Sequence, residues 1–464
     1  MRALIIAALA LATMARTATA ADDAPAYLAA GYKALFTCSA TFLANRTADQ
    51  IERNELTGIY PEYTAPIKKL AAARIDRRRG WVTVAYDPLM PPRTATYRGT
   101  LGCVVLPPGA GSSLRLVGVA LPDERAKARD IAWPNGDRMS DTPIGINTRH
   151  KLAQVMKAAF DAKTYGKGSR TSAIVVASRA KLLAEAYSSD AGIYVPQRTW
   201  SVAKSLMGAV IGIAVKEHLI NIDEPVAFSS WAAPGDPRAK ITFRHLLNMA
   251  SGLDAGAAGN RTDEIYFGGG LVEEHAMTRE LAAAPGTRWN YANNDTLLLS
   301  YGLRERIRDD RVYLAYPYEK LFRRIGMRHT TAETDWGGTF ILSSQVWTTA
   351  RDLTRFGLLL LNDGKWAGQE VLPAGWVKYM GTPVPAQPPL ERANGDQVPG
   401  YGAQIWLFGK RHGLPEGTLA AQGNRGQYVI VVPSRGIVIV RRGFDGDGAR
   451  FAIDKFAADV LKAL

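Results

Sequence analysis

The spacing of hydrophobic residues along the chain predicts both strands and helices. Residues 173–177 and 181–187 are two β-rich runs separated by a short turn, and residues 427–432 and 436–441 form a similar pair near the C-terminus. Two such runs joined by a tight turn are typical of a β-hairpin. The chain is therefore expected to contain two hairpins that lie far apart in the sequence.

Other segments follow the helical period. The most apolar of them begins near Trp200, and nearly every position up to Val215 is hydrophobic. A helix that is apolar on all sides is a buried helix. Further helices are predicted for residues 24–35, 243–250, 294–307, 349–361 and 449–464, and the fourth of these begins with the capping pattern of Thr349 and Asp352.

The patterns divide the chain into two parts. Residues 21 to about 165 combine the first helix with proline-containing loops and short β-rich runs such as 80–86 and 114–120, and they show no catalytic motif. We interpret this part as an N-terminal α+β accessory region. Residues 166–464 contain strands, a large helical middle, strands again and a terminal helix, so they form the main domain.

The first twenty residues have the pattern of a secretory signal peptide. Residues 3–12 are apolar, and residues 18–20 are small, as a signal peptidase requires. The apolar run is too short to span a membrane, and no later stretch of about 18 apolar residues follows. Residues 1–20 are therefore predicted to be a signal peptide, and the mature protein is expected to be secreted or periplasmic, with no integral membrane segment.

Composition excludes several function classes. The 464 residues are 47% hydrophobic and 22% charged, which indicates a folded chain of two or three domains. The net charge of +14 is densest between Arg74 and Arg79, but no aromatic residues alternate with these arginines, as binding to nucleic-acid strands would require. A solvated basic face explains this run, and nucleic acid is not an expected partner. The sequence gives no indication of the oligomeric state.

The chain has two cysteines, Cys38 and Cys103, and it lacks both Cys-x-x-Cys and His-Glu-x-x-His. A metal site is therefore not expected, and no cofactor is implied. In an oxidising compartment the two cysteines can form a disulfide, worth roughly 4 kcal/mol in the chain-entropy model. Two separate buried thiols are the alternative.

An exported hydrolase without a metal usually needs an activated nucleophile. Ser-x-x-Lys occurs twice: Ser178 and Lys181 lie at the first hairpin turn, whereas Ser201 and Lys204 open the buried helix. Residues three apart share a helix face, and burial lowers the pKa of an amine. Lys204 is therefore predicted to take the proton of Ser201, and a helix-terminal serine beside a snorkelling lysine is the alternative for so short a motif.

Two further segments can complete such a site. In Tyr291-x-Asn293 the tyrosine can carry a proton, either as a tyrosinate or coupled to the lysine, and the asparagine can orient the lysine and bind a substrate carbonyl. Residues 423–427 enter a late strand, where an exposed N–H can bind an oxyanion. The alternatives are a packed tyrosine with a helix-capping asparagine, and a tight loop at the start of a strand.

These three pieces, in this order and spacing, resemble the serine β-lactamase and penicillin-binding-protein superfamily. The likeness is greatest to its class C-like branch, with the related esterases and 6-aminohexanoate-dimer hydrolases. Residues 241–253 and 321–327 are similar to two other stretches of that family, and the resemblance covers about residues 166–464. It implies an α/β (α+β) fold of the β-lactamase/transpeptidase type: an antiparallel sheet flanked by helices, with a helical subdomain.

Carried over residue by residue, the resemblance assigns five roles. Ser201 is the acylated nucleophile, Lys204 its base and Tyr291 the acid for the leaving group. Asn293 positions Lys204 and the substrate, and the backbone N–H groups of Ser201 and Asn424 form the oxyanion hole. Tyr266 is a candidate for a substrate-facing residue over the cleft, with an ordinary surface tyrosine as the alternative.

One departure from the family bears on the substrate. Members that process β-lactams carry Lys-Thr-Gly or His-Thr-Gly on the late strand, where this chain has Ala421-Gln422-Gly423. The cationic group for a substrate carboxylate is therefore missing unless Arg425 supplies it. We predict an exported serine hydrolase that acts on a carboxylic ester or small amide. A penicillin-recognising DD-peptidase or β-lactamase, and a non-catalytic wall-binding protein on the same scaffold, are the alternatives.

Overall fold

The computed structural model describes most of the chain, and of the predicted signal peptide it describes only Ala20. Within this part, no helix has the length and apolar character needed to cross a bilayer. The described residues are 20–111, 114–139, 144–179, 181–256, 262–391, 395 and 397–464.

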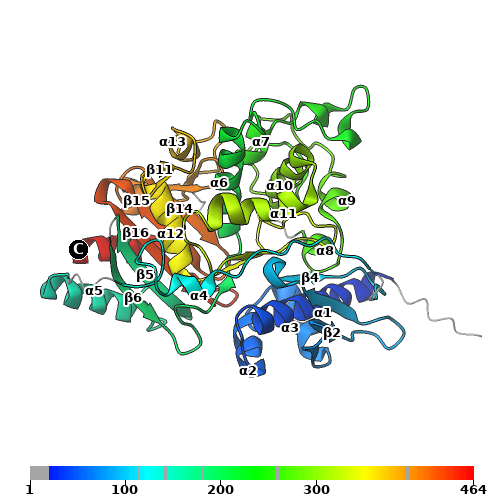
Figure 1. The fold of residues 1–464 in the computed structure, drawn as a ribbon, viewed down its shortest axis with the longest axis horizontal. Coiled ribbons are helices and arrows are strands. Elements are labelled where there is room, and N and C mark those ends of the chain that lie inside the picture. The colour runs from blue at the N-terminus through cyan, green and yellow to red at the C-terminus, as the bar shows by residue number, and fades with distance from the viewer. Residues whose placement is uncertain are drawn as a thin grey trace, which may run out of the picture.

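A seven-stranded antiparallel sheet organises the main domain (Figure 1). Both predicted hairpins are present, and they meet in this sheet because β16 pairs with β5, with Val440 opposite Val175. The strand order is β12-β13-β14-β15-β16-β5-β6. The bounds are β5 (Thr171–Ser178), β6 (Leu182–Tyr187), β12 (Gly400–Tyr401), β13 (Trp406–Phe408), β14 (Thr418–Gly423), β15 (Gln427–Val432) and β16 (Ile437–Gly443).

Alternation along the central strands gives the sheet two buried faces. In β16, Val438 and Val440 join one hydrophobic core, whereas Ile437 and Ile439 join the other. Successive side chains of a strand point to opposite faces, so a run of apolar residues forms two cores at once. On the first face lie α6 (Val202–Lys216) and α12 (Ala350–Leu361), and on the second lie α5 (Ile146–Ala158) and α14 (Ile453–Ala463).

The helical middle of the chain covers the first face beyond α6. Two predicted helices match closely: Thr349 caps α12 by accepting from the N–H of Asp352, and α10 starts one residue before the prediction. The helix predicted for residues 243–250 ends earlier, because Met249 adopts a left-handed φ of 55°. The helices are α7 (Phe243–Leu247), α8 (Asp263–Tyr266), α9 (Val272–Ala276), α10 (Asn293–Ile307), α11 (Asp310–Pro317) and α13 (Trp376–Met380).

The N-terminal region packs a long helix across a four-stranded sheet, and the disulfide Cys38–Cys103 joins the two. Figure 1 shows this region, in blue, beside the helical middle. Its helices are α1 (Ala20–Phe42), α2 (Ala48–Ile51), α3 (Pro61–Lys69) and α4 (Arg125–Ala128), and its strands, in sheet order, are β1 (Arg74–Asp76), β2 (Trp81–Val84), β3 (Arg93–Tyr97) and β4 (Cys103–Val105).

Shorter elements connect these units. The small strands are β7 (Gln197–Arg198), β8 (Thr331–Ala332), β9 (Val346–Thr348), β10 (Lys365–Trp366) and β11 (Gln369–Glu370). The 3-10 turns are Gly99–Leu101, Ser229–Trp231, Pro237–Lys240, Lys410–His412 and Pro433–Arg435, and the π-helical turns are Glu52–Leu56 and Tyr318–Phe322.

Two segments differ from the sequence prediction. Residues 114–120 form no strand: no neighbouring strand lies beside them, and Val117 and Val119 are only partly buried against the core. The helix α5, which falls within the predicted accessory region, packs on α14 and β6 of the main domain. The local sequence could not predict either feature, because both depend on which part of the folded chain lies next to the segment.

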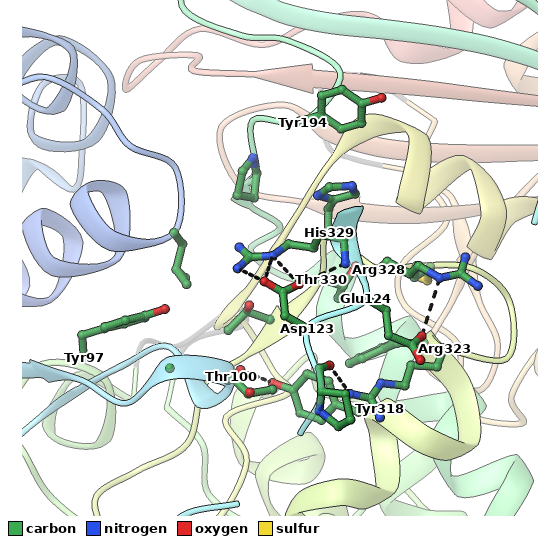
Figure 2. Close-up of a pocket in the computed structure, with 18 residues that line it drawn as sticks. Tyr97, Thr100, Asp123, Glu124, Tyr194, Tyr318, Arg323, Arg328, His329 and Thr330 are labelled. Atoms are coloured by element: carbon green, nitrogen blue, oxygen red, sulfur yellow. Dashed lines mark hydrogen bonds and ion pairs between the residues drawn. The ribbon is translucent and has the colours of Figure 1, made fainter. Parts of the chain in front are cut away.

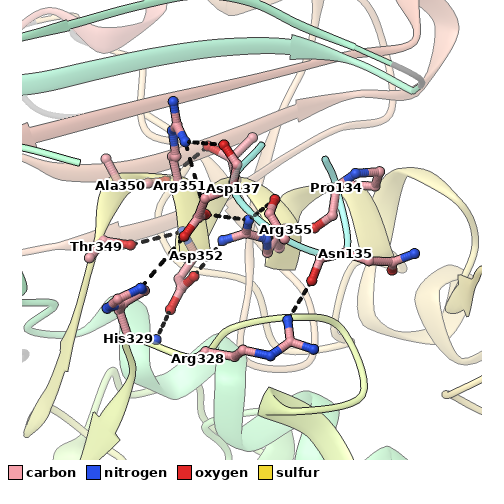
Figure 3. Close-up of polar contacts among 12 residues, drawn as sticks. Pro134, Asn135, Asp137, Arg328, His329, Thr349, Ala350, Arg351, Asp352 and Arg355 are labelled. Atoms are coloured by element: carbon pink, nitrogen blue, oxygen red, sulfur yellow. Dashed lines mark hydrogen bonds and ion pairs between the residues drawn. The ribbon is translucent and has the colours of Figure 1, made fainter. Parts of the chain in front are cut away.

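A buried charge network fastens the connecting segment around residues 134–137 to the main domain. Figure 3 shows Arg355 of α12 between two carboxylates, each 2.7 Å from its guanidinium: Asp137 of the connector and Asp352 of the same helix. Burial by itself raises the pKa of Asp137. The contacts with His329 and Arg355 outweigh burial and lower the pKa to about 2. Arg355 also donates to the carbonyl of Pro134. The connector is thus held by ionic contacts rather than by strand pairing.

Candidate active site

Ser201 lies at the N-terminus of α6, directly after a strained turn. Trp200 has a φ of 51°, a left-handed conformation that is uncommon for a bulky residue. The helix that follows is buried from Val202 to Ala214, as its apolar sequence predicts. This turn holds the Ser201 side chain half-buried at the edge of a cleft.

Lys204 lies one turn into the helix and faces the serine. Its Nζ is 3.2 Å from Ser201 Oγ, 2.6 Å from Asn293 Oδ1 and 2.8 Å from the carbonyl oxygen of Ser343. Burial, followed by the positive charge of Arg198, lowers the pKa of Lys204 to about 7. An amine with this pKa is partly neutral near pH 7, and only the neutral amine can accept a proton.

Tyr291 reaches the same site from the loop before α10. Its ring centre is 5.1 Å from Lys204 Nζ, and the ring packs against Tyr401 and Trp406. Burial raises the pKa of Tyr291 to about 12, although hydrogen bonds with Ser201 and Trp406 lower it. The phenol therefore keeps its proton at neutral pH, which favours the lysine-coupled form over a free tyrosinate.

The end of β14 lies against the start of the nucleophile helix. A Cβ added to Gly423 would stand 2.3 Å from the carbonyl oxygen of Thr199 and 3.1 Å from the backbone nitrogen of Ser201. Only glycine permits so close an approach. Asn424, the next residue, lines the cleft. Gly423 therefore brings the end of β14 against the backbone of Ser201, and an oxyanion hole formed by the N–H groups of Ser201 and Asn424 stays a prediction.

Arg425 does not provide a cation to the cleft. The residue is only 6% exposed and turns away toward the N-terminal region, where the guanidinium donates to the carbonyl oxygens of Asn54 and Thr57 at 2.7 and 2.8 Å. It donates to the carbonyl of Asp445 as well. The idea that Arg425 replaces the missing cationic residue of the family is therefore wrong: the arginine joins two parts of the chain.

Tyr266 is buried and is not a surface tyrosine. It lines the cleft, and its hydroxyl bonds to the hydroxyl of Ser343, whose carbonyl accepts from Lys204. Burial raises its pKa above the ordinary value.

The other Ser-x-x-Lys motif, Ser178 and Lys181, does not form a site of this kind. Lys181 is exposed at the β5–β6 turn, and the Ser178 hydroxyl donates to the backbone carbonyl of Lys181.

The cleft has a volume of about 550 Å³ and includes residues that the motifs did not reveal. The N-terminal region contributes Tyr60, Pro61 and Glu62, although its sequence shows no catalytic pattern. Proline at the first helical position predicts a helix start, but nothing in the sequence places that start beside Ser201. The lining residues are Tyr60, Pro61, Glu62, Trp200, Ser201, Tyr266, Tyr291, Asn293, Ser344, Trp406, Gln422, Gly423, Asn424 and Tyr428.

A second hollow of about 260 Å³ lies between the N-terminal region and the helical middle (Figure 2). Both of its acids are paired, since Asp123 binds Arg125 at 2.6 Å and Glu124 lies 3.6 Å from Arg328, and Arg323 donates to the carbonyl of Pro122. None of its lining residues is a serine or a lysine. The described lining of this hollow holds no Ser–Lys pair, so the cleft at Ser201 is the candidate active site.

A family model described as beta-lactamase matches residues 196–442. The chain belongs to the beta-lactamase family. Its fold is the β-lactamase/transpeptidase fold, an antiparallel sheet flanked by helices, as the resemblance of the motifs implied. Members of the family are serine hydrolases, and at the level of the superfamily the protein is a hydrolase. The matched residues include Ser201, Lys204, Tyr291 and Asn293, and the whole of the N-terminal region lies outside the match.

Solved structures of other beta-lactamase-family proteins share this fold. A proposed 6-aminohexanoate-dimer hydrolase from Bacillus anthracis is 22% identical, with a TM-score of 0.52 over 63% of this chain and 78% of that one. A family VIII carboxylesterase is 13% identical, with a TM-score of 0.54 over 70% and 98%. A mutant class C β-lactamase is 12% identical, with a TM-score of 0.51 over 70% and 100%. At these identities the likeness shows the fold alone.

Proposed function

We propose that this protein is an exported serine hydrolase that cleaves a carboxylic ester or small amide through an acyl-enzyme on Ser201. One observation carries the proposal: the buried Nζ of Lys204, with a pKa lowered to about 7, lies 3.2 Å from the Ser201 hydroxyl. An amine poised near the working pH can remove the hydroxyl proton, and this makes the oxygen a nucleophile.

The geometry supports a two-step reaction. Neutral Lys204 takes the proton of Ser201 as Oγ bonds to the carbonyl carbon, and the N–H groups of Ser201 and Asn424 stabilise the oxyanion. The tetrahedral intermediate collapses, and the leaving oxygen or nitrogen receives a proton through Tyr291. Water then attacks the ester on Ser201 and gives its proton to Lys204. The bond from Oγ to the acyl carbon breaks, Ser201 Oγ takes that proton back, and the acid is released. Asn293 holds the Lys204 amine in line throughout.

The charge of the cleft supports an ester or small amide over a penicillin. The described lining contains no cationic side chain to bind a substrate carboxylate, since Arg425 turns away and residues 421–423 are Ala-Gln-Gly. The neighbours include a carboxylesterase and a hydrolase of an aminohexanoate dimer, which act on esters or linear amides by description. A penicillin-recognising DD-peptidase or β-lactamase is the runner-up.

Covalent labelling tests the proposal. The full chain is incubated with a fluorophosphonate and with p-nitrophenyl acetate, and the modified peptide is identified by mass. We expect labelling on Ser201, loss of labelling in Ser201→Ala and normal labelling in Ser178→Ala, which removes the serine of the other Ser-x-x-Lys. Labelling that survives Ser201→Ala, or none in the parent, overturns the acyl-enzyme. A fluorescent penicillin retained on Ser201 would favour the runner-up, and peptidoglycan binding without any labelling would favour a non-catalytic wall-binding protein.

Export is part of the proposal and rests on two features. The first twenty residues have the signal-peptide pattern, and Cys38 is bonded to Cys103, as expected in an oxidising compartment. Expression of the full chain in a Gram-negative host should yield periplasmic protein that begins near Ala21. Cytoplasmic protein that retains residues 1–20 would contradict export without affecting the acyl-enzyme.

A further inference from the structure

We propose that the cleft selects substrates that carry a positively charged group, and that Glu62 of the N-terminal region recognises this group. The inference rests on the proposed function and names the substrate class for the same site. It follows from residues 60–62 of the N-terminal region, which form one wall of the cleft, and from the charges of the side chains that line the cleft.

The wall is fixed firmly beside the nucleophile. The ring of Tyr60 meets that of Trp200 edge to face, with 5.8 Å between the centroids, and Trp200 directly precedes Ser201. Arg425 binds the carbonyls of Asn54 and Thr57, which shortly precede Tyr60 in the chain. Glu62 therefore lies in the first turn of α3, directly after Pro61, on an anchored backbone that forms part of the cleft wall.

The lining of the cleft at Ser201 combines one charged side chain with several aromatic side chains. Glu62 is the sole charged side chain among the described residues that line this cleft, and it is exposed. A carboxylate near aromatic faces attracts an ammonium group by charge and by cation–π contact, and it repels a carboxylate. The aromatic lining residues are Tyr60, Trp200, Tyr266, Tyr291, Trp406 and Tyr428.

Neighbouring charges do not reverse this preference. Lys204 is buried and already donates to three oxygens. The adjoining hollow beyond Tyr428 carries Arg450 and Asp454 together, and the one behind Asn424 adds the exposed Asp447. The side chains that line the cleft therefore carry a net negative charge, and the cations behind them, Lys204, Arg198 and Arg425, are buried. This contrasts with the overall charge of +14.

Two matched ester pairs test the inference, with the charge on either side of the scissile carbonyl. The first compares p-nitrophenyl 4-(trimethylammonio)butanoate with its neutral isostere, the 5,5-dimethylhexanoate. The second compares acetylthiocholine with the acetyl thioester of 3,3-dimethylbutanethiol. The quantity measured is the ratio of kcat/KM for the cationic ester to that for the neutral one. We expect a ratio above 1 in at least one pair for the parent protein.

Glu62→Gln should lower that ratio about fivefold, as expected for an exposed ion pair. Glu62→Lys should lower it further and raise kcat/KM for mono-p-nitrophenyl glutarate, which bears a carboxylate. The control Glu52→Gln, on another exposed acid of the same region, should leave the ratio unchanged. A parent ratio at or below 1 in both pairs, or a ratio that Glu62→Gln and Glu62→Lys leave unchanged while Ser201 is still labelled, overturns the inference alone. Absence of labelling overturns the proposed function as well.

Discussion

The pH dependence of acylation tests the central feature of the site, the neutral amine of Lys204. Its pKa falls from 10.5 to about 7, which disfavours the charged form by about 5 kcal/mol at 1.36 kcal/mol per pH unit. At pH 7 about half of the molecules then hold a neutral amine. With an ordinary pKa only about one molecule in 3,000 would hold a neutral amine. Burial therefore raises the fraction of molecules that can accept the serine proton roughly a thousandfold.

The assay is kcat/KM for p-nitrophenyl acetate between pH 5 and 9, corrected for spontaneous hydrolysis. We expect a tenfold loss per pH unit below about pH 7 and a plateau above about pH 8. Because Tyr291 keeps its proton up to about pH 12, no fall is expected on the alkaline side of this range. A flat profile, or a midpoint above pH 9, would refute the assignment of Lys204 as the base.

Substitution of the lysine gives an independent check. Lys204→Arg places a guanidinium that stays protonated at every working pH, so acylation should fall by roughly 10³-fold or more. Lys216→Arg, at the far end of the same helix, is the matched control and should keep the parent rate. Equal losses in both variants would point to a general effect on the helix.

Three further outcomes follow from the structure. Tyr291→Phe should reduce kcat by about 10² to 10⁴ with little change in Tm, as for loss of a proton donor, and unaltered turnover would remove Tyr291 from the mechanism. Gly423→Ala should abolish most activity because its Cβ would lie 2.3 Å from a backbone oxygen, whereas Gly118→Ala, with open space around it, should be fully active. Activity assays of the two variants test this expectation, and equal activities would contradict it. Arg355→Met should lower the free energy of unfolding by about 3–5 kcal/mol because it removes the cation that two buried carboxylates share, whereas Arg125→Met, at an exposed pair, should cost less than about 1 kcal/mol. Urea denaturation measures both, and similar losses would contradict this account.

Local patterns in the sequence predicted the parts of the site that lie on one element. Ser201 and Lys204 are neighbours because helix geometry makes them so, and the apolar residues of α6 already imply a buried amine. The two hairpins were equally visible, because pairs of short β-rich runs joined by tight turns predict them. The family motifs then supplied Tyr291 and Asn293, which no local rule could have placed beside Lys204.

The contribution of the N-terminal region could not be predicted in this way. Glu62 and Tyr60 carry no motif, and their place in the cleft depends on how two folded surfaces meet. The direction of Arg425 was equally hidden, because a guanidinium in a loop before a strand can turn to either side. Two of the carbonyl groups that bind it, those of Asn54 and Thr57, lie 371 and 368 residues away in the chain.

That arginine makes the N-terminal region difficult to exchange. Arg425 directly follows the residue proposed to bind the oxyanion, and two of the carbonyls that bind its guanidinium belong to the opposite end of the chain. A chimera with a foreign N-terminal segment would need acceptors at the same two points, or it would leave part of a buried cation without hydrogen bonds next to the proposed oxyanion hole. Insertions or deletions between residues 54 and 57 would therefore disturb turnover even if every side chain of the cleft were preserved.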